Sequence, residues 1–186
     1  MTTRDLVLIA LFTAIIVVLG LIPPVTLGAV PITAQSMGVM LAGCIIGAKR
    51  GALAYVLVIL MVAIGLPVLS GGRGGLAILA GPTGGYIIGW VVGAYVTGIL
   101  AERLVSERQT GGRQIAGFLL ASVIGGIGIV HLFGVAWLAF HTKSNLGVAF
   151  MVGSAPFIPF DLLKACIATL AARAVLAGYP LLHARA

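Results

Sequence analysis

Residues 146–172 read LGVAFMVGSAPFIPFDLLKACIATLAA, an apolar run in which Asp161 and Lys164 are the only charged side chains. A charge near the middle of a membrane costs roughly 2.5–3.5 kcal/mol on insertion scales, so both side chains need a reason to be there. Three positions apart on a helix, they face the same side and can partly neutralise each other. They form either a polar recognition site for a ligand or a self-satisfied pair that only locks helix packing.

The composition of the chain is that of an integral membrane protein. Of its 186 residues, 61% are hydrophobic and 8% are charged, against roughly 25% charged residues in soluble domains. Mean hydropathy is +1.22. Apolar runs of about 20 residues recur along the whole length. We therefore predict an all-α fold with a single transmembrane domain over residues 1–186.

The apolar runs predict a six-transmembrane-helix bundle. The second run is shorter than the roughly 20 residues that span a bilayer, so its outer end is expected to be irregular. Residues 22–35 before it hold three prolines, and residues 67–85 are rich in glycine, so both stretches are predicted to be irregular. The six predicted segments are residues 6–21, 37–48, 52–66, 86–101, 115–140 and 152–177.

The connections between these segments alternate in charge. One side holds eight of the eleven basic residues, whereas the other side holds only Arg73 and Lys143. The positive-inside rule then places both termini in the cytoplasm. Because the basic residues lie at segment ends, the formal net charge of +7 indicates topology and not nucleic-acid binding. The eight are Arg4, Lys49, Arg50, Arg103, Arg108, Arg113, Arg173 and Arg185.

The unusual polar residues converge on the predicted outer side. A site walled by apolar helices and holding a carboxylate, an ammonium and several neutral polar groups suits a small polar solute that carries an acid group. It does not suit an ion pore, which would repeat rings of polar groups. The candidate binding residues are Asp161, Lys164, Arg73, Gln35, Thr33 and Tyr86.

Catalysis is poorly supported by the sequence, and the chain is predicted not to be an enzyme. No HExxH or Gly-x-Ser-x-Gly motif is present, and Ser154 has no evident basic partner in the sequence. His131 stands alone in an apolar run, where a packed or hydrogen-bonded core role is the commoner one. We expect no cofactor and no metal ion.

Four stretches of the chain resemble the BioY family, the biotin-specific substrate-capture (S) subunits of energy-coupling-factor transporters. The resemblance covers nearly the whole chain, and its most specific parts are the Gly-Pro-Thr-Gly-Gly-Tyr run and the Asp-x-x-Lys pair. The stretches are Pro31-Ile32-Thr33-Ala34-Gln35, Gly65-Leu66-Pro67-Val68, Gly81-Pro82-Thr83-Gly84-Gly85-Tyr86 and Phe160-Asp161-x-x-Lys164.

The resemblance implies a multi-pass subunit in the inner (plasma) membrane of a prokaryote that binds biotin from outside. It adds Thr83 to the candidate site, and it implies that Ala10 and Ala14 contact a transmembrane coupling (T) subunit, with energy supplied by ABC-type ATPases. Asp161 and Lys164 would complement the ureido ring, and Arg73 or, alternatively, Lys164 would meet the carboxylate. Capture of another vitamin, such as thiamine or riboflavin, and a non-transporting role remain the alternatives.

Overall fold

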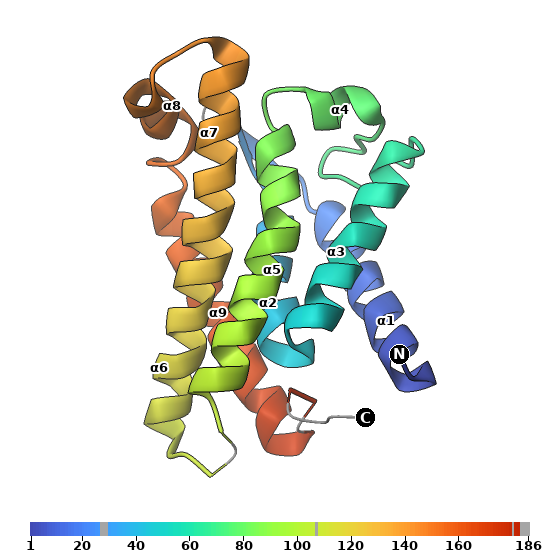
Figure 1. Ribbon diagram of the computed structural model, residues 1–186, viewed down its shortest axis with the longest axis vertical. Helices are drawn as coiled ribbons and strands as arrows, with labels where there is room; N and C mark the ends of the chain where they lie inside the picture. Colours follow the sequence, from blue (N-terminus) through green and yellow to red (C-terminus); the bar gives the residue numbers. More distant parts are fainter. Residues whose placement is uncertain (27–29, 107, 180, 183–186) are drawn as a thin grey trace.

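The computed structural model describes all residues except 27–29, 107, 180 and 183–186, so Arg185 of the topology prediction lies outside it. The described chain is almost entirely helical (Figure 1). Its helices are α1 (Thr3–Gly20), α2 (Gln35–Ile46), α3 (Ala48–Ala63), α4 (Leu76–Ala80), α5 (Gly84–Leu104), α6 (Gly111–Ala121), the π-helix η1 (Ser122–Ile129), α7 (Val130–Thr142), α8 (Leu146–Gly153) and α9 (Ile158–Gly178).

Each of the six predicted segments contains a helix, but the helices differ in their capacity to cross a bilayer. By length and composition, α1, α5 and the continuous helix formed by α6, η1 and α7 are each able to span one. The bent pair α8 and α9 would make a fourth span. At 12 and 16 residues, α2 and α3 are shorter than the roughly 20 residues that a span needs. The count of six membrane crossings therefore stays a prediction.

The sixth predicted segment is not one helix. It breaks after Gly153, and α9 starts at Ile158 at an angle of 58° to α8. Proline disfavours helical geometry in the residue before it and lacks the N–H of an interior helical bond. Pro156 therefore falls in the break, whereas Pro159 occupies the first turn of α9, where its missing N–H is not needed.

The two stretches predicted to be irregular contain short regular elements. Strands β1 (Val25–Thr26) and β2 (Pro31–Ile32) pair antiparallel within residues 22–35. Helix α4 lies within residues 67–85. Both additions lie in the half of the molecule opposite the start of α1 and the end of α9 (Figure 1).

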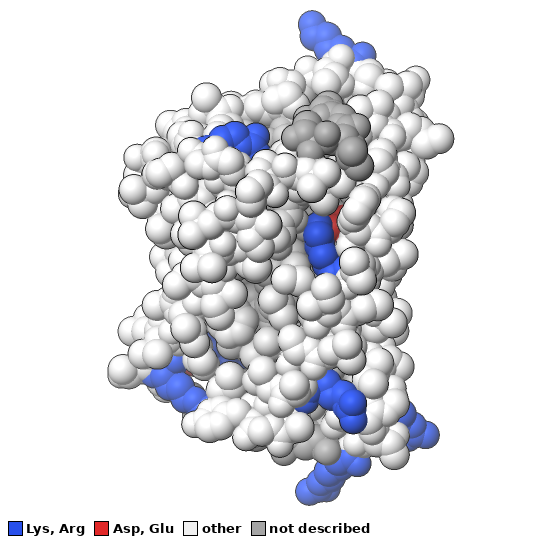
Figure 2. Space-filling model, turned by 180° about the vertical axis from the view of Figure 1, so that it is seen from behind, with Lys and Arg blue, Asp and Glu red and all other residues white. Residues whose placement is uncertain are grey.

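Basic residues that the topology prediction groups together do meet at one end. Arg50 lies 3.6 Å from the Asp5 carboxylate and donates to the Leu181 carbonyl, which joins the start of α1, the start of α3 and the C-terminal segment. The start of α1 and the end of α9 lie at this same end of the bundle (Figure 1). Figure 2 shows basic side chains at both ends of an otherwise uncharged surface, and one beside an acidic side chain in a hollow between them.

Helix α5 is the centre of the bundle and packs against α2, α3, α6, η1 and α7. Glycines at 85, 89 and 93 form a stripe on its α7 side. A Cβ added at Gly85 would lie 2.2 Å from Trp137 Cβ, and one at Gly93 would lie 2.7 Å from Val130 Cγ2. Small residues of this kind let membrane helices approach closely. The stripe thus brings the start of α7, with His131, against the upper half of α5.

Candidate ligand-binding cavity

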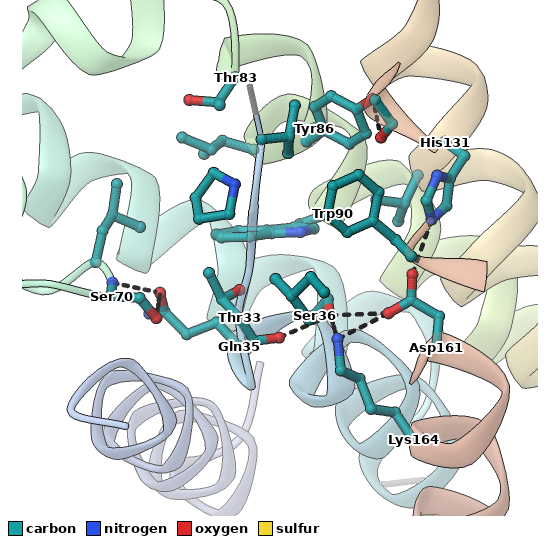
Figure 3. Close-up of a pocket in the computed structure, with 18 of the residues that line it drawn as sticks. Thr33, Gln35, Ser36, Ser70, Thr83, Tyr86, Trp90, His131, Asp161 and Lys164 are labelled. Atoms are coloured by element: carbon teal, nitrogen blue, oxygen red, sulfur yellow. Dashed lines mark hydrogen bonds and ion pairs between the residues drawn. The ribbon is translucent and has the colours of Figure 1, made fainter. Parts of the chain in front are cut away.

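A cavity of about 660 Å³, counting the space that opens to solvent, lies among the upper ends of the helices. Its walls come from β2 and the start of α2, from residues 69–73, from the first half of α5, and from η1, α7 and α9. Segments far apart in the sequence therefore form one compartment (Figure 3).

The charged centre of the cavity is the pair that the helical spacing predicts. Lys164 Nζ donates to Asp161 Oδ1 at 2.8 Å and to Ser36 Oγ at 2.9 Å. Both Asp161 and Lys164 line the cavity, and Asp161 is only 5% exposed. The Ser36 hydroxyl has one hydrogen, for which the Thr33 carbonyl at 3.2 Å and Asp161 Oδ1 at 3.5 Å are the two acceptors within reach. Ser36, which the sequence analysis did not select, is thus part of the charged centre.

His131 holds the other oxygen of the same carboxylate. Its Nε2 lies 2.9 Å from Asp161 Oδ2, and its Nδ1 lies 2.5 Å from Ser154 Oγ. Figure 3 shows the Asp161 carboxylate between the imidazole of His131 and the ammonium of Lys164. The expectation that Ser154 lacks a basic partner is therefore wrong. His131 is hydrogen-bonded, as a core role would have it, yet it also lines the cavity.

The Gln35 side chain is a structural link between three segments. Its amide nitrogen donates to the carbonyls of Ile16 and Val68 at 3.2 and 2.9 Å, and its amide oxygen accepts from the Ser70 N–H at 3.0 Å. The Ser70 hydroxyl lies 3.4 Å from the same oxygen. An amide has two donors and two acceptor positions, so Gln35 lines the cavity with its hydrogen-bonding capacity already used by the protein.

Aromatic rings supply the apolar part of the wall. Tyr86, Trp90 and Phe157 line the cavity, and all three are buried. Tyr86 donates its hydroxyl hydrogen to the Gly153 carbonyl at 2.6 Å, and its ring stands edge-on to His131 with 5.9 Å between centroids. With its polar end engaged, Tyr86 presents mainly a ring to the cavity. The wall therefore favours a ligand with an apolar ring or chain.

Arg73 and two threonines complete the set of predicted residues. Arg73 Nε donates to the Ser70 carbonyl at 3.0 Å, and no described residue accepts from the two outer nitrogens of the guanidinium, which are thus placed for a ligand. Thr33 and Thr83 lie at the cavity wall, the latter just before α5. The structure brings together all seven candidate residues, which are Asp161, Lys164, Arg73, Tyr86, Gln35, Thr33 and Thr83.

Ala10 and Ala14 lie outside the cavity, on the exposed side of α1. Their neighbours on that side include Leu6, Val7 and Leu11, which are 56%, 60% and 51% exposed. This face is apolar and carries small residues one turn apart. It has the composition of a surface that packs against lipid or another helix.

The chemistry available in the cavity is recognition by hydrogen bonding and charge. Among the described residues, no three His, Cys, Asp or Glu side chains are grouped closely enough to hold a metal ion. Ser154 is fully buried and is not part of the cavity wall, so its hydroxyl is not presented to a ligand.

Three comparisons relate the chain to known proteins. The sequence profile described as "BioY family" matches residues 1–181. The chain is 60% identical over its whole length to a protein of Rhizobium etli named "Biotin transporter BioY", which is also fully covered. It is 47% identical to a protein of the same name from Rhodobacter capsulatus, with 92% and 93% of the two chains covered. The solved S-component for biotin from an ECF-type ABC transporter superposes with a TM-score of 0.86 at 32% identity, covering 94% of each chain.

Proposed function

Since this chain belongs to the BioY family, we propose that it is a biotin-binding membrane subunit that captures biotin for uptake. It is a transport subunit and not an enzyme. The observation that carries the proposal is the unfilled hydrogen-bonding capacity at Asp161 and Lys164, which lies beside an aromatic wall in the cavity.

The donor and acceptor inventory of this pair fits the ureido ring of biotin. An ammonium has three N–H donors, and within the described residues Lys164 directs two of them to Asp161 and Ser36, which leaves one for a ligand carbonyl. A carboxylate oxygen has about two acceptor positions. Oδ2 of Asp161 receives His131 alone among the described residues, so one position is left for a ligand N–H. The ureido edge offers a carbonyl and N–H groups side by side.

The remaining parts of biotin find matching surfaces in the same cavity. The rings of Trp90 and Tyr86 suit the apolar bicyclic ring and chain. Arg73 suits the carboxylate at the end of the aliphatic chain of biotin, because a guanidinium matches a carboxylate in shape and charge. Lys164 is the other candidate partner for that carboxylate, and a substitution at Arg73 distinguishes the two orientations of biotin in the cavity.

We also propose the predicted topology, with six crossings and both termini in the cytoplasm of a prokaryote. The supporting observation is that Asp5, Arg50 and Leu181 meet at one end, whereas the cavity is lined by β2, residues 69–73 and the starts of α5 and α9 in the opposite half. Under the positive-inside rule the basic end faces inward. The cavity then opens toward the outer side, where external biotin is available.

Transport further requires partner subunits in this proposal. The sequence has no Gly-x-x-x-x-Gly-Lys-Ser/Thr motif, so ATP hydrolysis would come from ABC-type ATPases acting through a T subunit. The exposed face of α1 with Ala10 and Ala14 is the proposed contact with that subunit, because small residues permit close helix approach.

The test is equilibrium binding of radiolabelled biotin to the purified protein, with unlabelled thiamine, riboflavin and biotin as competitors. We expect saturable binding that only biotin displaces. Displacement by another vitamin would make that vitamin the ligand. A folded protein that binds none of them would support a purely structural role for the Asp161 and Lys164 pair.

A further inference from the structure

We infer that His131 is a positioning residue that fixes the orientation of the Asp161 carboxylate, so that one acceptor of Oδ2 stays available to a ligand N–H. The inference rests on the proposed function and deepens it. It gives a role to His131, which is ionisable and which is not expected to contact biotin itself.

The contacts of Asp161 define this role. Lys164 holds Oδ1 at 2.8 Å and His131 holds Oδ2 at 2.9 Å, so each oxygen is anchored by a different helix. A carboxylate with both oxygens anchored cannot rotate about its Cβ–Cγ bond. With His131 removed, rotation would let both oxygens turn toward Lys164 and Ser36, and the acceptor facing the ligand would be lost.

Ser154 fixes His131 in turn. The hydrogen bond made by one ring nitrogen of a histidine decides which nitrogen carries the proton. A carboxylate only accepts, so Nε2 must carry a proton to bond Asp161, while Nδ1 pairs with the Ser154 hydroxyl. Ser154 is fully buried in the break between α8 and α9, and its N–H donates to the Phe150 carbonyl at 2.9 Å. It is therefore a rigid support.

The order of atoms distinguishes this arrangement from a hydrolytic triad. The serine lies behind the imidazole, outside the cavity wall, whereas the aspartate lines the cavity. The hydrogen-bonded series from Ser154 through His131 to Asp161 thus presents an acceptor to the ligand and not a nucleophile. Its consequence is selectivity for ligands that present an N–H at this point.

Two substitutions at His131 separate positioning from packing. The amide nitrogen of glutamine reaches about as far as Nε2, and that of asparagine about as far as Nδ1. His131→Gln therefore keeps a donor for Asp161, whereas the shorter side chain of His131→Asn keeps a hydrogen-bonding group only within reach of Ser154. His141→Asn is the matched control, since this histidine is exposed near the end of the same helix.

The experiment measures the dissociation constants of biotin and of an analogue methylated on a ureido nitrogen for each purified variant. A buried acceptor without its donor costs about tenfold or more in affinity, so the wild-type protein should prefer biotin by at least that factor. We expect His131→Asn to bind biotin about tenfold more weakly and to lose most of this preference. His131→Gln should retain most of it, and His141→Asn should match the wild type.

Each result supports or overturns the inference. The inference is overturned if His131→Asn still prefers biotin over the methylated analogue as strongly as the wild type does. It is also overturned if the asparagine and glutamine variants lose this preference equally. The second comparison counts only when both variants elute as single species and unfold at the wild-type temperature. If His131→Asn does not fold, Ser154→Ala is the second variant, and an undiminished preference for biotin in that protein overturns the inference. Failure of the wild-type protein to bind biotin at all would refute the proposed function instead.

Discussion

Asp161 Oδ1 lies 2.8 Å from Lys164 Nζ, one turn further along α9. The pair is buried together in the cavity, where removing one partner leaves the other charge without compensation. Because each member also has hydrogen-bonding capacity left over, single substitutions confound stability with recognition. A double substitution separates the two effects.

Asp161→Asn and Lys164→Met should each weaken biotin binding by about tenfold to a hundredfold, since each leaves a buried mismatch of roughly 1–3 kcal/mol. The combined variant has no unpaired charge and should fold, yet should still fail to hold biotin. Isothermal titration and thermal unfolding of all three variants are the measurements. Near-native affinity in the combined variant would contradict the site assignment.

Arg73→Gln should weaken biotin binding by about tenfold, because a charge-assisted hydrogen bond to the ligand carboxylate is lost. Biotin amide, which lacks that carboxylate, should bind the variant and the wild type alike. The comparison of the two ligands identifies the cation that meets the carboxylate. An unchanged affinity of Arg73→Gln for biotin would instead identify Lys164 as the partner of the biotin carboxylate.

Gln35→Leu should lower the stability of the folded protein, because it leaves the Ile16 and Val68 carbonyls and the Ser70 N–H without their partner. Each orphaned buried group costs about 1–3 kcal/mol. The apparent unfolding temperature in detergent is the readout. Gln109→Leu is the control, because the hydrogen bonds of Gln109 to the Leu104 carbonyl and the Ser106 N–H are exposed and only half-buried, respectively. Equal unfolding temperatures for the two variants would refute the structural role of Gln35.

Gly85→Ala should separate α7 from α5 and thereby displace His131, because the added Cβ would lie 2.2 Å from Trp137 Cβ. We expect weaker biotin binding and a lower unfolding temperature. Gly112→Ala is the matched change, since nothing lies within 4 Å of a Cβ at that position. If both variants behave like the wild type, close approach at the glycine stripe is not needed for the site.

Ala10→Trp and Ala14→Trp should abolish uptake and co-purification with a T subunit while leaving biotin binding intact. The alanines are exposed on α1 and far from the cavity wall, so bulk there obstructs only an external helix. Leu170→Trp, at a 59% exposed position of α9, controls for a bulky residue on another face. Retained co-purification in both alanine variants would place the contact elsewhere.

The sequence predicted the helices and the charged pair because both follow from local spacing. Apolar runs set the helix positions, and the three-residue interval between Asp161 and Lys164 set their common face. The break before α9 was not predicted, although Pro159 lies in the first turn of α9 and a proline there indicates the start of a helix.

The partnership of His131 with Ser154 could not be inferred from spacing, since 23 residues, including the end of α7 and the whole of α8, separate them. The rule that drew attention to Asp161, that ionisable residues within membrane segments are functional, would also have selected His131. The role of Gln35 was less accessible. Its partners are mainly backbone atoms, and no side-chain pattern records them.

The Gln35 amide has a consequence for biogenesis. Its partners at Ile16, Val68 and Ser70 all precede α5 in the sequence. A polar amide in lipid must find partners within the protein. The first three helices and the segment that follows α3 therefore satisfy this buried amide during synthesis without a contribution from any later helix.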